Sequence, residues 1–129
     1  MCGLDLERES GHVLDAAVTL ARKFSAQVRL IHGVAVPEST STRDYVSEFD
    51  RFLVDSTREK LMKMQEQAGT QLELRFEGGS ISKVVRTAAM DQGADLVVIG
   101  RGHVQAPLSR LRSNAYAIIR DAPCPVLSV

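Results

Sequence analysis

Hydrophobic positions along the chain alternate between helical and strand spacing. Between residues 12 and 25, apolar side chains recur every three or four positions, which predicts an amphipathic helix. The same spacing predicts helices over residues 45–67, over residues 81–92 before Gly93, and from an N-cap at Ser113 to the Pro123 break. Runs typical of strands lie between these helices, at residues 27–36, 71–77, 96–99 and 126–129.

Strands separated by helices predict right-handed crossovers and an open parallel sheet with helices on both faces. The fully apolar run at residues 96–99 is typical of a buried strand. Apolar and polar side chains alternate over residues 71–77, which favours a strand at the edge of the sheet. A further strand is suspected at residues 1–5, although only its end precedes the polar stretch that follows. We expect one α/β domain over residues 1–129.

Composition excludes several classes of protein. The 16 basic and 16 acidic side chains cancel, which argues against nucleic acid or a charged membrane surface as a partner. No apolar run approaches the ~20 residues of a membrane span, and residues 1–10 do not resemble a secretory signal. We therefore expect a cytoplasmic protein in which Cys2 and Cys124 are reduced. His12, His32 and His103 lack zinc-site spacing, so no metal is expected.

Candidate chemistry gathers where strands end, because ligands of open parallel sheets bind outside the carboxyl ends. The stretch from Gly100 to Ser113 leaves a strand through glycines and enters a helix, and it carries three arginines and no acid. It could hold a phosphate, or it could be a solvated basic loop. The chain has neither a P-loop nor a nucleophile elbow, so we expect no enzyme, although slow ATP hydrolysis stays open.

Two segments resemble a known family. Residues 94–100 read Ala-Asp-Leu-Val-Val-Ile-Gly, and residues 122–129 read Ala-Pro-Cys-Pro-Val-Leu-Ser-Val. On these motifs nearly the whole chain resembles the universal stress protein family. The resemblance implies a five-stranded parallel sheet in the order 3-2-1-4-5. It also implies a stress-response regulator that acts through protein interaction and forms a homodimer through its C-terminal strand.

ATP-binding members of that family have an aspartate closing strand one and the pattern Gly-x2-Gly-x9-Gly-[Ser/Thr] after strand four. Asp5, Gly100 and Ser113 match this pattern. Gly102 stands one position early, and Arg112 stands where the third glycine belongs. Arginine there brings side-chain bulk against the phosphates, or supplies a compensating cation.

The resemblance implies a tentative nucleotide site. Asp5 and the Val34 backbone would hold adenosine, while Gly100, Gly102, Ser113 and Asn114 would meet phosphate and ribose. Two functions stay open: a protein-interaction dimer with a degenerate nucleotide loop, and a regulator that binds ATP through Asp5 and the Gly100–Ser113 loop.

The length of 129 residues fits the family only if strand one is cut short. In the implied strand order that strand is central, so its shortening would expose apolar surface on both neighbours. Either the start was placed late, or the fold tolerates a short first strand.

Overall fold

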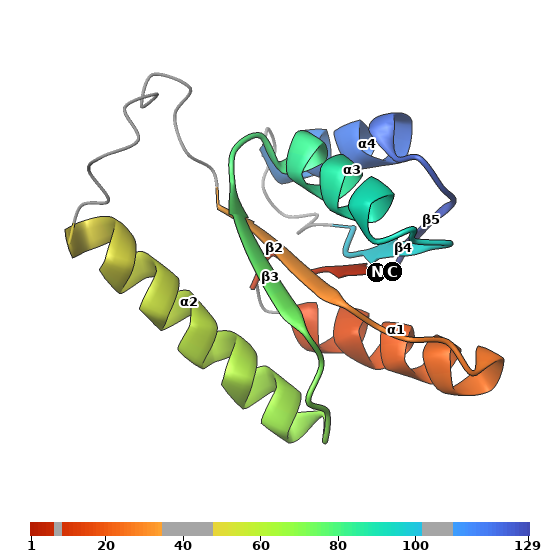
Figure 1. The fold of residues 1–129 in the computed structure, drawn as a ribbon, viewed down its shortest axis with the longest axis horizontal. Helices are drawn as coiled ribbons and strands as arrows, with labels where there is room; N and C mark the ends of the chain where they lie inside the picture. The colour runs from red at the N-terminus through yellow and green to blue at the C-terminus, as the bar shows by residue number, and fades with distance from the viewer. Residues whose placement is uncertain (7–8, 35–47, 102–109) are drawn as a thin grey trace.

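A computed structural model describes residues 1–6, 9–34, 48–101 and 110–129, with only the backbone described at 48–51, 53 and 110–113 (Figure 1). Strands and helices alternate along these parts of the chain. The elements are β1 (Cys2–Gly3), α1 (Ser10–Phe24), β2 (Leu30–Val34), α2 (Glu48–Gln67), β3 (Leu74–Gly78), α3 (Ile81–Asp91), β4 (Val97–Ile99), α4 (Arg110–Asp121) and β5 (Val126–Ser128).

The strands form one parallel sheet in the order β3-β2-β1-β4-β5, which confirms the predicted architecture. β1 is central although it is only two residues long, so the predicted shortening of this strand is also confirmed. Cys2 pairs with Leu30 of β2 and with Val98 of β4, and Gly3 continues both ladders. As predicted, β3 lies at one edge of the sheet.

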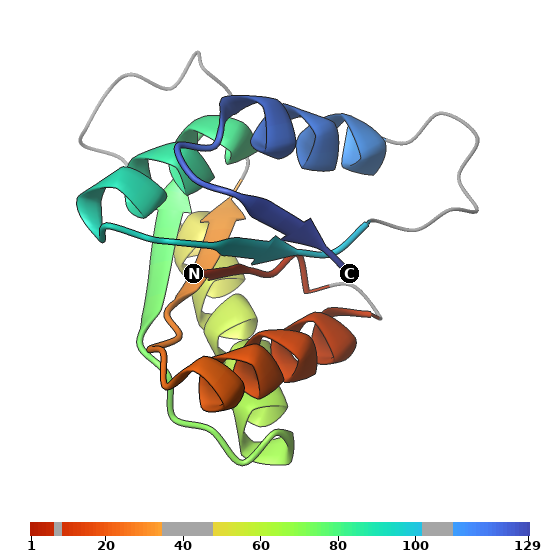
Figure 2. The same cartoon turned by 90° about the vertical axis from the view of Figure 1, so that its right-hand side faces the viewer.

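Helices cover both faces of the sheet (Figure 2). On one face α1 and α2 bury a cluster with β1, β2 and β4, which contains Cys2, Leu4, Val13, Leu14, Ala17, Leu30, Leu61 and Val98. On the other face α3 and α4 bury a second cluster, which contains Ile31, Val84, Val85, Ala88, Ala89, Val97, Ile99 and Ile118. The apolar positions of each helix therefore face the sheet, as their spacing predicted.

One predicted helix boundary is wrong. α4 begins at Arg110, so Ser113 lies within its first turn and does not cap it. Arginine and leucine are good helix formers, and the run from Arg110 to Arg112 continues the helix upstream of the serine. Ser80 does precede α3 in extended conformation, but its side chain makes no capping hydrogen bond.

Three strands begin later than their hydrophobic pattern predicted. β2 starts at Leu30 instead of residue 27, β3 at Leu74 instead of residue 71, and β4 at Val97 instead of residue 96. The ladder between β2 and β3 begins at the pair Leu30 and Leu74, and the ladder between β4 and β5 begins at the pair Val97 and Val126. The strand-like residues before these pairs lie outside the ladders.

The structure also bears on the two cysteines and on the expected absence of a membrane span. In the described residues both cysteines are free thiols, with Cys2 buried on β1 and Cys124 half-buried after α4. Burial raises the pKa of the Cys2 thiol to about 12. None of the helices described is long and apolar enough to cross a membrane.

Candidate functional site

A pocket of about 210 Å³ lies at the carboxyl ends of β1, β2 and β4. This is the position where parallel open sheets hold ligands, because the crossovers leave in opposite directions on the two sides of β1. Its walls are formed by Gly3, Leu4, Asp5, Ile31, His32, Gly33, Ile81, Val85, Ile99, Gly100, Asn114, Ala115 and Ile118. Most of these residues are apolar, and the polar side chains are those of Asp5 after β1, His32 on β2 and Asn114 on α4.

Asp5 is held in place by the start of α1. The hydroxyl of Ser10, the first residue of α1, donates a hydrogen bond to Asp5 Oδ1 over 2.7 Å. Ser10 is buried, whereas Asp5 is exposed. The carboxylate thus lies near the positive end of a helix dipole and can still accept hydrogen bonds from a ligand.

His32 fixes the chain just before Asp5. Its Nδ1 lies 2.7 Å from the Leu4 carbonyl oxygen, which can only accept, so Nδ1 carries the proton. The ring also meets Phe76 edge-on, with centroids 6.1 Å apart. β2 and β3 therefore support the segment that carries Asp5. Sequence reasoning considered His32 only as a zinc ligand, because the contact joins residues 28 positions apart.

Gly33 on β2 lies against the side chain of Ile81, the first residue of α3. A Cβ at position 33 would lie 2.8 Å from Ile81 Cδ1, so that methyl group would have to move. The glycine therefore sets where the Ile81 side chain lies in the pocket wall. Sequence analysis did not single out Gly33, because nothing local distinguishes a glycine needed for close packing.

The structure brings together three of the predicted site residues, Asp5, Gly100 and Asn114. Val34 ends β2 and is not among the wall residues, and its carbonyl accepts a hydrogen bond from Gly79 N–H over 2.9 Å. Arg112 and Ser113 lie in the first turn of α4, where only the backbone is described. Gly102 falls outside the described residues.

The family model for the universal stress protein family matches residues 1–129. The chain belongs to the universal stress protein family. It is similar to universal stress protein A of Escherichia coli (strain K12), with 30% identity over 134 residues that span 100% of this chain and 91% of the relative.

Solved universal stress proteins share its fold. One from Archaeoglobus fulgidus superposes with a TM-score of 0.73 at 19% identity, covering 98% of this chain and 94% of that one. Another, solved in complex with cAMP, superposes with a TM-score of 0.72 at 21% identity, covering 99% of this chain and 93% of that one. At these identities the likeness concerns the fold, and the sheet order of this universal stress protein agrees with it.

Proposed function

We propose that this universal stress protein is a cytoplasmic regulator that binds an adenine nucleotide at the pocket beside Asp5 and does not turn it over. The observation that carries the proposal is the meeting of Asp5, Gly100 and Asn114 at the carboxyl ends of adjacent strands. The crystallised relative in complex with cAMP supports the choice of an adenine nucleotide. The absence of a P-loop and a nucleophile elbow from the sequence supports binding without turnover.

The pocket suits one part of a nucleotide. Its volume of about 210 Å³ is below the ~300–1,000 Å³ of most ligand sites, so it matches the base and ribose better than a whole nucleotide. The apolar walls would cover the base, and the Asp5 carboxylate would accept hydrogen bonds from ribose hydroxyls or the adenine amino group. The phosphates would then extend toward Gly100 and the first turn of α4, whose dipole favours an anion.

Calorimetric titration of ATP and of cAMP into the purified chain tests the proposal. Asp5→Asn keeps an acceptor for the Ser10 hydroxyl and removes the charge. We expect it to weaken nucleotide binding roughly tenfold or more, as is usual when a hydrogen bond to a charged group is lost. Asp15→Asn, at an exposed position of α1, is the matched control and leaves the affinity unchanged. No heat at millimolar nucleotide, or equal affinities of the two variants, would contradict the proposal.

We further propose that a homodimer forms through β5, as the resemblance implies. β5 lies at the edge of the sheet opposite β3, and Leu127 on it is 38% exposed. An uncapped edge strand offers a row of backbone groups to a second copy. Light scattering at micromolar concentration should give a dimer mass for the natural chain and a monomer mass for Leu127→Lys. Met62→Lys, on the exposed side of α2, is the control that stays dimeric. A monomeric natural chain would rule out this assembly.

A further inference from the structure

The sheet has a second edge at β3, on the side opposite β5. β3 is five residues long and pairs with β2 along its whole length. No other strand of the described chain pairs with it. An edge strand of this kind presents a row of backbone groups that another strand can bind. The side chains and backbone groups of β3 therefore decide what this edge can hold.

The ladder with β2 shows which backbone groups of β3 point outward. In a parallel ladder, successive residues of a strand direct their backbone groups to opposite sides. Leu30 N–H of β2 donates to the Glu73 carbonyl over 2.8 Å, so the odd-numbered residues from 73 onward face β2. The N–H and carbonyl groups of Leu74, Phe76 and Gly78 therefore point away from the sheet. Within the described chain these groups have no hydrogen-bond partner.

The side chains of β3 are arranged symmetrically about its middle residue. On one face Arg75 forms an ion pair with Glu77, and a second with Asp91 of α3 over 3.3 Å. The Arg75 and Glu77 side chains are 36% and 23% exposed. On the other face Phe76 is half-buried, and the Arg58 guanidinium of α2 lies 5.4 Å from its ring centroid. A cation and an anion thus stand on either side of an aromatic residue.

We propose that β3 binds β3 of a second copy of this chain, antiparallel and centred on Phe76. A two-fold axis at this residue sets Phe76 opposite Phe76 of the second copy, and Leu74 opposite Gly78. Each of these outward residues then exchanges its N–H and carbonyl hydrogen bonds with the residue opposite. Centring on Phe76 pairs β3 along its whole length, so that the sheets of the two copies become continuous.

The charges of β3 are complementary to themselves in this pairing. Arg75 of each copy lies directly opposite Glu77 of the other. These are positions without hydrogen bonds between the copies, where opposed Cα atoms are about 4.5 Å apart and side chains are closest. Opposite charges stabilise such a pair, whereas like charges destabilise it. A second copy supplies both the matching charges and a second phenylalanine, which is why it fits this edge better than an unrelated strand.

The contact at β3 is weak and separate from the proposed dimer through β5. It is made mainly by one five-residue strand of each copy, which places it among interfaces below ~1,200 Å² with a dissociation constant on the order of 0.1 mM. It is therefore mostly dissociated at micromolar concentration. Since β3 and β5 lie at opposite edges, pairing at β3 joins β5 dimers end to end into an open chain at high concentration.

Two charge reversals test the pairing in a Leu127→Lys parent, so that association through β5 does not enter. Arg75→Glu leaves two acids on β3, and Glu77→Arg leaves two bases. Each variant alone should self-associate at least tenfold more weakly than the parent, because like charges then oppose each other. An equimolar mixture should associate within about threefold of the parent, since acids of one variant lie opposite bases of the other. Sedimentation equilibrium from roughly 10 µM to 1 mM measures this.

Asp15→Arg is the matched control, because it reverses an exposed charge on α1, which contacts β1 and β4, and it should associate like the parent. A parent that stays monomeric at 1 mM, or an unchanged affinity of Glu77→Arg alone, would overturn the proposal.

Amide exchange in the same parent gives a second measurement that needs no change in β3. Phe76 N–H should exchange about fivefold more slowly at 1 mM than at 10 µM, whereas Arg75 N–H, which faces β2, should be slow at both concentrations. Association without slower exchange at Phe76 would place the contact elsewhere and contradict the proposal. Neither measurement depends on nucleotide binding or on β5.

Discussion

The two ends of β1 differ in how their polar groups are satisfied. At the carboxyl end the chain supplies its own partners, since Ser10 donates to Asp5 and His32 to the Leu4 carbonyl. At the amino end Arg29 N–H, Leu96 N–H and Gln92 Oε1 have no partners in the described residues. A strand of two residues can therefore hold the centre of a sheet when one end is firmly anchored.

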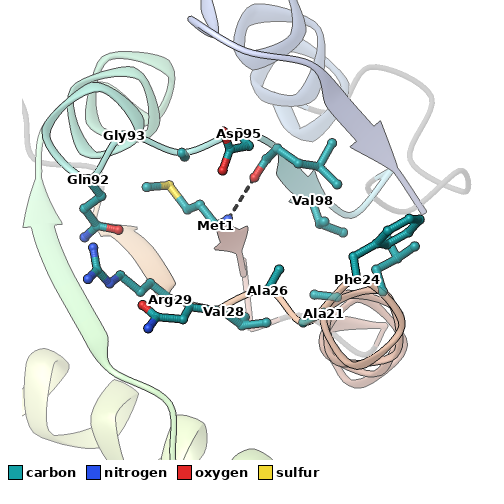
Figure 3. Close-up of a pocket in the computed structure, with 15 residues that line it drawn as sticks. Met1, Ala21, Phe24, Ala26, Val28, Arg29, Gln92, Gly93, Asp95 and Val98 are labelled. Carbon is teal, nitrogen blue, oxygen red and sulfur yellow. Dashed lines mark hydrogen bonds between the residues drawn. The ribbon is translucent and has the colours of Figure 1, made fainter.

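The largest expected effect distinguishes the anchored end from the open one. Leu4 is 5% exposed and packs in the α1 face of the core, so Leu4→Ala should lower the free energy of unfolding by about 2–4 kcal/mol. Phe24 lines a cavity at the amino end of β1 (Figure 3) and is 71% exposed, so Phe24→Ala should change the free energy of unfolding by less than about 0.5 kcal/mol. Urea unfolding measures both. Similar losses for the two variants would mean that the ends of β1 do not differ in packing.

The next effect depends on pH. Burial raises the pKa of the Cys2 thiol to about 12, so the folded state holds this proton more tightly than the unfolded chain does. The resulting stability is complete below the unfolded pKa of about 9 and is lost as the pH rises toward 12.

Above pH 9, the natural chain should lose about 1 kcal/mol per pH unit more than Cys2→Ala does. Urea midpoints between pH 7 and 10.5 measure this difference. Cys124→Ser, which changes the half-buried thiol, is the control and should keep the slope of the natural chain. If the stability of the natural chain and that of Cys2→Ala fell equally as the pH rises, Cys2 would not titrate in a buried position.

A smaller effect concerns the anchored end alone. Ser10→Ala removes the hydroxyl that donates to Asp5 and should lower the free energy of unfolding by about 1–2 kcal/mol. Asp5 is exposed, so water replaces part of the lost contact and the lower value is the better guide. Thermal melts with Ser56→Ala on α2 as the control measure it. Equal melting temperatures of Ser10→Ala and Ser56→Ala would mean that the Ser10–Asp5 hydrogen bond does not stabilise the fold.

The smallest effect has the opposite sign and concerns the open end. Gln92 Oε1 is a buried acceptor without a donor, so Gln92→Leu should stabilise the chain by about 1 kcal/mol. Gln67→Leu, at the exposed end of α2, is the control that leaves the stability unchanged. Destabilisation by Gln92→Leu would mean that the oxygen has a partner in solution.

The sequence predicted the fold closely because each element buries a regular apolar face. It missed the starts of β2, β3 and β4, since periodicity reports a strand's own side chains and not where its pairing with a neighbour begins. Residues 27–29 and 71–73 have strand-like sequence, but the ladder between β2 and β3 begins only at Leu30 and Leu74. The start of α4 was missed for another reason, because helix formers before Ser113 outweigh its capping preference.

The site was predicted in part. Asp5 and Gly100 follow strands, and the carboxyl ends of parallel strands share one edge, so their meeting was predictable. Asn114 was part of the nucleotide site that the family resemblance implies. Ser10, His32 and Gly33 were not predicted, because their roles depend on contacts across α1, β1, β2 and α3. No sequence motif marks the cavity at the amino end of β1.

Amide hydrogen exchange followed by NMR tests the difference between the two ends of β1 most directly. Leu4 N–H donates to Ile31 at 3.1 Å and Cys2 N–H donates to Arg29, so both should exchange slowly. Arg29 N–H and Leu96 N–H have no hydrogen-bond partner among the described residues, so they should exchange at least tenfold faster. Strong protection of Arg29 and Leu96 in the free chain would contradict the account.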